Sequence, residues 1–281
     1  MERRPLGRTG AELSIIGMGG IVIKEVEQAE ADRIVSEAVA RGVNYFDVAP
    51  TYGNAEARLG PALEPYRDQV FLVGKTEERT EKESARDLDH TLRTLRTDYL
   101  DLYQLHGLAS VEQVETVFGP KGAITTLESA RQVGKVRFLG FSAHSVDAAL
   151  EALRRFPFDS VLFPINFACW FKGFGPQVLE AAKSHGAGRL ALKAMARTFW
   201  PEQGQRKWQN CWYEPLDQPE KAELALRFTL SQEVTATIPP GEPTLFRMAM
   251  DLADCFRPIT PPEEQRLRDM ARGLQPIFPQ D

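Results

Sequence analysis

Short apolar runs alternate with amphipathic helical stretches along the chain. The first run, residues 13–20 (LSIIGMGG), has the apolar character of a strand and ends in glycines. Residues 27–42 then place apolar side chains at helical spacing, and the closing Gly42 is typical of a helix end. Residues 43–48 (VNYFDV) are the next predicted strand. The chain therefore begins as a strand, a helix and a second strand.

The same alternation continues to the end of the chain. Further strands are predicted over residues 69–75, 99–106, 135–142, 160–166, 188–194 and 234–240. Helices are predicted over residues 81–95, 123–133, 146–155, 176–185, 219–230, 244–253 and 262–272, and the tail PIFPQD follows. Repeated alternation of this kind implies parallel strands joined by crossover helices.

These units predict an α/β fold, a (β/α)8 TIM barrel that forms a single domain over residues 1–281. Eight parallel strands are enough to close such a barrel, and no break in composition divides the chain. An open doubly wound sheet is the structural alternative. That fold usually carries G-x-G-x-x-G after its first strand, whereas this chain has GMGG there.

Polar side chains stand where the predicted strands end. Asp47 ends the second strand, Lys75 the third and His106 the fourth, and Tyr52 follows in the turn after Asp47. In a parallel α/β barrel the carboxyl ends of all strands meet at one mouth. We therefore expect these side chains to converge on one cavity.

Each of these residues also has an ordinary structural explanation. Asp47 could cap the following turn, since aspartate is a favoured capping residue. Lys75 could be a solvated strand end, His106 a buried histidine with its hydrogen bonds satisfied, and Tyr52 a packing residue. The prediction of a site therefore rests on the combination and not on any one residue.

The combination suits proton transfer to an oxygen that becomes an alkoxide. A free tyrosine has a pKa of about 10, and a buried ammonium beside it favours the phenolate and lowers that pKa. Lys75 could supply the ammonium, Asp47 could keep it protonated, and His106 could donate a hydrogen bond to a substrate oxygen. This arrangement predicts carbonyl reduction, with Tyr52 as general acid and a nicotinamide cofactor as the hydride source.

Composition adds exclusions to this prediction. Of the 281 residues, 43% are hydrophobic and 26% are charged, which is ordinary for a globular protein. A net charge of −5 argues against a nucleic-acid partner, and no stretch approaches the roughly 18 continuous apolar residues of a membrane span. Cys169, Cys211 and Cys255 lack the spacing of a disulfide framework or a metal site, so no metal is expected. The polar N-terminus shows no signal peptide, and the expected location is cytoplasmic.

The chain resembles the aldo-keto reductase family in several stretches that follow the family's order. These stretches are PLGRTGAELSIIGMGG, GVNYFDVAPTYGNAEARLG, VFLVGKT, TLRTLRTDYLDLYQLH, GKVRFLGFS and IPPGEPTLF. The resemblance covers most of the chain and implies a barrel that binds a nicotinamide dinucleotide without a Rossmann domain. It implies that Asp47, Tyr52, Lys75 and His106 are the catalytic tetrad, with NADP as the expected cofactor and NAD as the alternative.

The resemblance also implies a set of cofactor-binding residues at the strand ends. They are Gly19, Gly20, Ser142, Asn166, Lys193, Pro239, Gly241 and Arg247. Lys193 departs from the family pattern, since many members carry an aromatic or small residue there, and its charge could meet the pyrophosphate or pair with a neighbouring acid. Ala143 stands where the family usually has asparagine, and His144 could substitute for it. Glu242 would repel a 2′-phosphate if it pointed inward, although Arg247 could still reach that phosphate.

An aromatic-rich insertion, residues 197–219, separates the seventh predicted strand from its helix. Connections of this length are usually functional or disordered, and the aromatic density argues against disorder. We expect Trp200 and Trp212 of this insertion, together with Trp170, to line an aromatic substrate pocket. The sequence does not decide whether this insertion is a lid over the substrate or the dinucleotide, a satellite core or an oligomer contact.

Two other functions remain open from the sequence. The chain could be a non-catalytic nicotinamide-binding regulatory subunit, because a fold does not determine a function. It could also be a Schiff-base barrel lyase with Lys75 or Lys193 as nucleophile, although Asp47 would hold Lys75 charged. The expected partner is a small carbonyl compound, and the sequence leaves its identity and the oligomeric state open.

Overall fold

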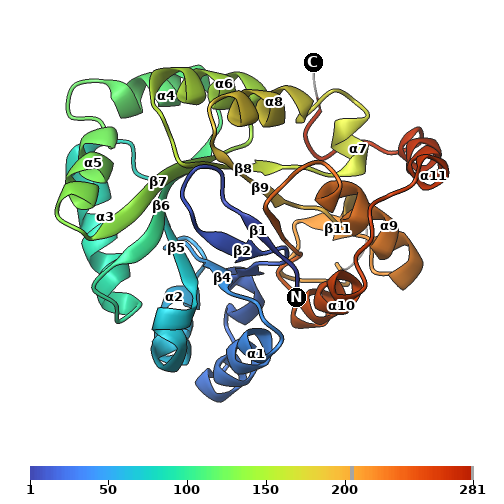
Figure 1. Cartoon of the computed structure of the whole chain (residues 1–281), viewed down its shortest axis with the longest axis horizontal. Helices are drawn as coiled ribbons and strands as arrows, with labels where there is room; N and C mark the ends of the chain where they lie inside the picture. The colour runs from blue at the N-terminus through green and yellow to red at the C-terminus, as the bar shows by residue number, and fades with distance from the viewer. Residues whose placement is uncertain (203–205, 280–281) are drawn as a thin grey trace.

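Eight parallel strands form a nearly closed barrel in the computed structural model of the chain, which describes residues 1–202 and 206–279 (Figure 1). A parallel bridge between Ile16 and Thr237 joins the two ends of the sheet. The predicted (β/α)8 class is therefore confirmed. In sheet order, the strands are β3 (Met18–Gly19), β4 (Tyr45–Asp47), β5 (Phe71–Thr76), β6 (Leu100–Leu108), β7 (Val136–Ala143), β8 (Ser160–Pro164), β9 (Gly188–Leu192) and β12 (Ala236–Ile238).

Helices surround this barrel (Figure 1). Several begin at a serine or threonine whose side chain accepts a hydrogen bond from an N–H of the first turn, as Thr80, Ser110 and Ser145 do. Short 3-10 turns cover Gly20–Ile23 and Glu64–Gln69. The helices are α1 (Gln28–Ala40), α2 (Ala55–Leu63), α3 (Glu81–Thr94), α4 (Val111–Phe118), α5 (Ile124–Gln132), α6 (Val146–Arg155), α7 (Phe167–Trp170), α8 (Pro176–Ser184), α9 (Pro219–Leu230), α10 (Pro243–Asp254) and α11 (Pro261–Ala271).

The sequence pattern did not reveal α2, because this helix contains Gly60 and Pro61. The glycine is needed for packing: a Cβ at Gly60 would lie 2.6 Å from the carbonyl oxygen of Thr94 at the end of α3. The proline falls in a helix too short to show a clear apolar period. Glycine usually marks a loop, but Gly60 here allows a close contact between α2 and α3.

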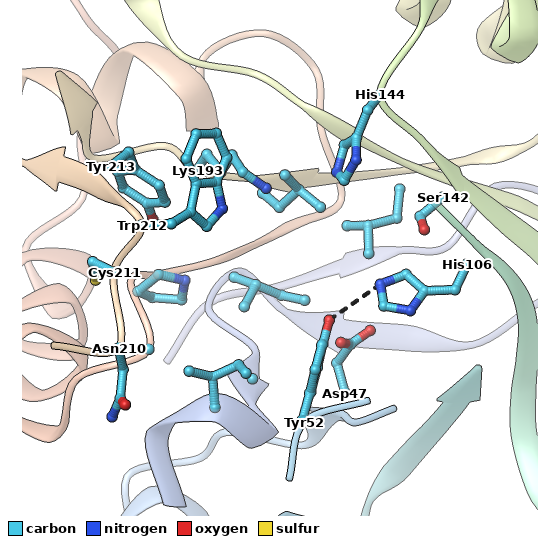
Figure 2. A pocket seen from close by; sticks show the side chains of 17 residues that line it. Asp47, Tyr52, His106, Ser142, His144, Lys193, Asn210, Cys211, Trp212 and Tyr213 are labelled. Carbon is cyan, nitrogen blue, oxygen red and sulfur yellow. Dashed lines mark hydrogen bonds between the residues drawn. The ribbon is translucent and has the colours of Figure 1, made fainter. Parts of the chain in front are cut away.

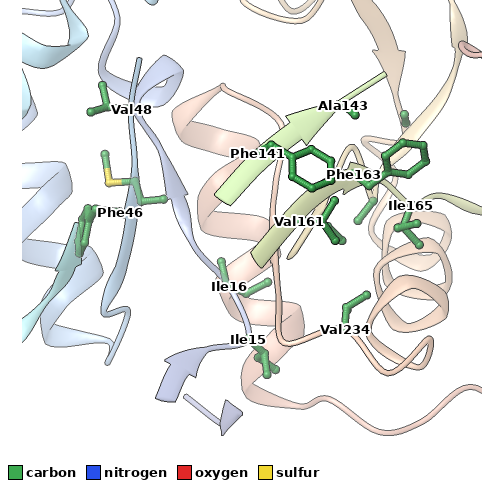
Figure 3. Packing of buried hydrophobic residues seen from close by; sticks show 14 of the residues in the cluster. Ile15, Ile16, Phe46, Val48, Phe141, Ala143, Val161, Phe163, Ile165 and Val234 are labelled. Atoms are coloured by element: carbon green, nitrogen blue, oxygen red, sulfur yellow. The ribbon is translucent and has the colours of Figure 1, made fainter. Parts of the chain in front are cut away.

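Alternate residues of each strand face the helices or the barrel interior. Phe46, Phe141, Val161 and Phe163 belong to the main core between strands and helices (Figure 3). Their neighbours in the strands form a separate inner cluster that fills the barrel. Its strand residues are Tyr45, Phe71, Val73, Leu102, Leu162, Leu190 and Ala236.

An antiparallel hairpin of β1 (Arg3–Pro5) and β2 (Glu12–Ser14) closes the end of the barrel at which the strands begin. Its Leu6 and Leu13 are fully buried in the inner cluster. The predicted strand over residues 13–20 is therefore divided between β2 and the two-residue β3. The opposite end, where the strands finish, is left free for a site. No helix within the described ranges is long and apolar enough to cross a membrane.

Candidate active site

The predicted tetrad converges at the carboxyl end of the barrel. Asp47, Tyr52 and His106 line a cavity of about 250 Å³ (Figure 2). Lys75 is fully buried beside it, where its Nζ donates a hydrogen bond to Oδ1 of Asp47 and lies 5.5 Å from the centroid of the Tyr52 ring. Side chains from three separate βα units therefore meet at one place.

The ion pair between Lys75 and Asp47 is almost without solvent contact, since the side chains are 0% and 2% exposed. Oδ2 of Asp47 accepts a hydrogen bond of 3.3 Å from the hydroxyl of Tyr45, which precedes it by two positions and shares its face of β4. Burial raises the pKa of Asp47 and lowers that of Lys75, while the attraction between their charges opposes both shifts. The pair is costly to bury and holds each partner in one position.

Tyr52 departs from the sequence prediction. A lowered pKa was expected, but burial raises the pKa of Tyr52 well above its ordinary value, and the charges of Asp47 and Glu77 add to this. Lys75 does not reverse the effect, because Asp47 accepts its hydrogen bond and offsets its charge. The phenol is therefore held protonated, which is the form that a proton donor needs.

His106 is neutral at physiological pH. Burial lowers its pKa to about 2, and the charges of Lys75, His144, Lys193 and Arg79 contribute. Its Nε2 lies 3.4 Å from the Tyr52 hydroxyl, and the two rings meet edge to face (Figure 2). A neutral imidazole can donate a hydrogen bond to an oxygen atom without also carrying a charge.

The structure brings five of the eight expected cofactor-binding residues to the cavity wall, namely Gly19, Ser142, Lys193, Pro239 and Gly241. Ser142 and His144 line the cavity, whereas Ala143 between them faces the helices in the main core. The residue at the position of the usual asparagine therefore points away from the site, and His144 faces it instead.

Gly20, Asn166 and Arg247 do not line the cavity. Gly20 is buried where a Cβ would lie 2.7 Å from Val48. The side chain of Asn166 caps α7 by accepting a hydrogen bond of 3.0 Å from the N–H of Cys169. Arg247 is held by the carboxylate of Glu37 on α1, with Nε at 2.9 and 3.1 Å from its two oxygens. No local sequence pattern indicates this last contact, because 210 positions separate the partners.

The three expected pocket tryptophans have different positions. Trp212 lines the cavity. Trp200 donates a hydrogen bond of 2.7 Å to the carbonyl oxygen of Cys211, and so joins two parts of the insertion. Trp170 packs edge-on against Phe228, with 6.0 Å between ring centroids, on the side of the helices. The structure thus brings one of these three residues to the cavity.

The insertion is organised around a hairpin of β10 (Ala196–Phe199) and β11 (Tyr213–Pro215), and residues 203–205 lie outside the described part of the chain. It contributes cavity residues that sequence reasoning missed, among them Asn210, Cys211 and Tyr213. Glu242, on the loop after β12, accepts a hydrogen bond of 2.7 Å from the N–H of Asn210. The described residues contain no group of His, Cys, Asp and Glu side chains that could hold a metal ion.

The buried ion pair gives a prediction for stability. Asp47→Asn and Lys75→Met should each lower the free energy of unfolding by about 3–5 kcal/mol, because each leaves one buried group without its partner. The double variant should lose less than the sum, since neither charge then remains. Urea denaturation of the wild type and the three variants measures this, and additive losses would show that the two charges do not depend on each other.

Comparison with known proteins agrees with this architecture. Residues 15–242 match the model of the aldo/keto reductase family. The chain is 28% identical over 228 residues to L-galactose dehydrogenase of Arabidopsis thaliana, a match that covers 74% of this chain and 70% of the plant protein. It is 27% identical over 180 residues to the uncharacterized oxidoreductase YqkF of Bacillus subtilis, where it spans 59% of this chain and 56% of that protein.

A solved structure supports the fold. The holo form of aldo-keto reductase AKR11C1 from Bacillus halodurans superposes with a TM-score of 0.76 at 24% identity, and the match covers 100% of both chains. Both proteins therefore share the barrel architecture over their whole length. Together with the family match over most of the sequence, this shows that the chain belongs to the aldo/keto reductase family, whose members are oxidoreductases that generally use nicotinamide cofactors.

Proposed function

We propose that the protein reduces the carbonyl group of small aldehydes or ketones to an alcohol, with a reduced nicotinamide dinucleotide as hydride donor. The observation that carries this proposal is the meeting of Tyr52 and His106 at one cavity, next to the buried pair of Lys75 and Asp47. The family match supports redox chemistry. Among its relatives, one is named as a dehydrogenase of a sugar.

Tyr52 would act as the general acid. A bound nicotinamide would supply the hydride to the carbonyl carbon. As the C=O π bond breaks, its electron pair moves to the oxygen, and the Tyr52 hydroxyl gives that oxygen its proton. The phenolate that remains lies near the ammonium of Lys75, with 5.5 Å between Nζ and the ring centroid. The Lys75 ammonium would offset part of the cost that burial and the Asp47 charge impose on this phenolate.

His106 would orient the carbonyl group. Its neutral imidazole has Nε2 close to the Tyr52 hydroxyl, so an oxygen that approaches this edge meets two polar groups at once. A hydrogen bond from an uncharged donor strengthens as the oxygen becomes an alkoxide. We assign His106 to substrate orientation and Lys75 and Asp47 to the support of Tyr52.

The cavity wall fits a dinucleotide at its β3 and β12 side. Gly19 and Gly241 line the cavity, and a Cβ would lie 2.8 Å from Ile238 at Gly19 and 2.2 Å from Ile21 at Gly241, so both glycines allow close packing of this wall. Gly241 lies just before the N-terminus of the 12-residue helix α10, where the helix dipole favours phosphate. We propose that these residues, with Pro239 and Ser142, hold the cofactor.

The insertion would form a fixed wall over this cofactor site. It is tied to the barrel by the hydrogen bond between Asn210 and Glu242, and Trp208 Nε1 donates a bond of 3.0 Å to Asp217 within it. Trp212 then presents its ring to the cavity. These contacts support a wall that is present before substrate binds.

Replacing Tyr52 with phenylalanine tests the proposed function. Tyr52→Phe should lower the rate of carbonyl reduction by about 10²–10⁴-fold, since it removes the proton donor and keeps the ring. The rate is measured with a panel of aldehydes, from the loss of ultraviolet absorbance as the reduced dinucleotide is oxidised.

Dinucleotide affinity, measured by fluorescence titration, should stay within about twofold of the wild type, because the phenol is assigned to substrate chemistry. A wild type that binds the dinucleotide but oxidises none of it with any aldehyde would favour the regulatory subunit. A variant as active as the wild type would remove Tyr52 from the mechanism.

The charges near the cofactor site bear on the choice between NADP and NAD. The family resemblance favours NADP. However, Arg247, the residue expected at the 2′-phosphate, forms an ion pair with Glu37, and Glu242 adds a negative charge at the start of α10. A 2′-phosphate would have to compete with Glu37 for the guanidinium. We therefore propose that NAD(H) binds at least as tightly as NADP(H).

Glu37→Gln tests this competition directly. Releasing Arg247 should increase the affinity for NADPH by about three- to tenfold and leave the affinity for NADH unchanged, because the 2′-phosphate is the group that distinguishes them. Fluorescence titration with both reduced dinucleotides gives the ratio. Asp32→Asn, which alters an exposed carboxylate of the same helix that contacts Gln28, is the control. A wild type that strongly prefers NADPH would contradict the proposal.

A further inference from the structure

Lys193 occupies an unusual position in the cavity wall. It is the first residue after β9, and its backbone has φ of 65°, in the left-handed region that side-chain-bearing residues seldom adopt. Such a conformation persists only where the surrounding structure holds it, and Lys193 is the residue with this conformation that lines the cavity, among the non-glycine residues described. The conformation directs a lysine side chain into the cavity.

The ammonium of Lys193 is enclosed by aromatic rings. Its Nζ lies 5.5 Å from the ring centroid of Trp212 and 5.6 Å from that of Phe278. Phe278 is itself fixed by stacking on His144 at 5.2 Å and on Phe174 at 5.1 Å. Ring faces attract a cation but do not neutralise it.

No carboxylate balances this charge within the described part of the chain. Lys193, which is half-buried, forms neither an ion pair nor a side-chain hydrogen bond there, whereas the fully buried Lys75 has Asp47. Burial lowers the pKa of Lys193 to about 8, so the side chain remains mainly protonated at neutral pH. A buried ammonium without a counter-ion gains free energy when an anion binds beside it.

The other titratable side chains at the cavity do not offer a free positive charge. His106 and His144 also face the cavity, but burial and nearby positive charge lower their pKa values to about 2 and about 3. Asp47 is paired with Lys75. Among the described residues of this wall, Lys193 is therefore the side chain that can offer a positive charge to a ligand.

We propose that Lys193 binds a carboxylate on the substrate, and that the preferred substrates are aldehydes or ketones that carry an acid group. In Figure 2, Lys193 lies across the cavity from Tyr52 and His106, on the side of His144 and Trp212. The cavity wall also includes the apolar Leu162 and Leu192. A short apolar linker would place the carbonyl at Tyr52 and the carboxylate at Lys193. This inference rests on the proposed carbonyl reduction and specifies its substrate class.

The same ammonium could instead meet the pyrophosphate of the dinucleotide, as the sequence suggested, or form a Schiff base with a carbonyl compound. The pyrophosphate has its own favourable position at Gly241 and the N-terminus of α10. Lys193 lines the same cavity as Tyr52 and His106, and its ammonium lies against the rings of Trp212 and Phe278. These contacts favour the substrate carboxylate.

The test compares an acidic and a neutral substrate of similar length. Lys193→Met keeps the length and removes the charge, and Lys183→Met on the exposed face of α8 is the matched control. For Lys193→Met, the ratio of kcat/KM for succinic semialdehyde to kcat/KM for butanal should fall about 10- to 100-fold, and Lys183→Met should leave this ratio unchanged. Affinity for each reduced dinucleotide should stay unchanged.

A binding measurement makes the test independent of catalysis. Calorimetric titration should show that the wild type binds succinate at least about tenfold more tightly than succinamide, and that Lys193→Met abolishes the difference. If the wild type reduces neither aldehyde, the proposed function fails, and the succinate titration still tests Lys193. Equal losses with both aldehydes, weaker dinucleotide binding, or a borohydride-trapped adduct on Lys193 would each overturn the inference.

Discussion

The site depends on one buried ion pair, between Lys75 of β5 and Asp47 of β4. The two strands pair in parallel and bring these side chains together in the barrel interior, where almost no water reaches them. In that environment neither group is stable in its charged form without the other. The pair therefore fixes the position of the ammonium, and the ammonium lies near the ring of Tyr52. Tyr52, the proposed proton donor, His106 and the cavity are arranged around this point.

The barrel makes this arrangement possible because its packed apolar residues and its polar site lie at opposite ends. The N-terminal hairpin and the inner cluster fill the end at which the strands begin. The opposite end can then hold polar and charged groups whose burial lowers stability. The same division explains why two lysines of different character lie at this end of the barrel. Lys75 has an internal counter-ion, and Lys193 has aromatic neighbours and faces the cavity.

The sequence was sufficient to predict the features that depend on local pattern. Apolar periodicity and strand-end residues indicate the barrel and bring Asp47, Tyr52, Lys75 and His106 to one mouth. Strand alternation also contains a signal that was not used: Tyr45 lies two positions before Asp47 on the same face of β4 and donates a hydrogen bond to it. The remaining features depend on partners far apart in the chain. Arg247 reaches Glu37, and Trp170 packs on Phe228. The direction of the Tyr52 pKa shift was mispredicted for a similar reason, since it is set by the depth of burial and by the carboxylates of Asp47 and Glu77.

In the proposed mechanism Lys75 contributes to catalysis by acting on Tyr52. The most direct test is a double-mutant cycle on the rate of hydride transfer in a single turnover, with wild type, Tyr52→Phe, Lys75→Met and the double variant. If Lys75 acts through the phenol, the double variant should be no slower than Tyr52→Phe alone. If the two losses multiply, Lys75 has a role independent of Tyr52, and the proposed action of Lys75 through the phenol is wrong.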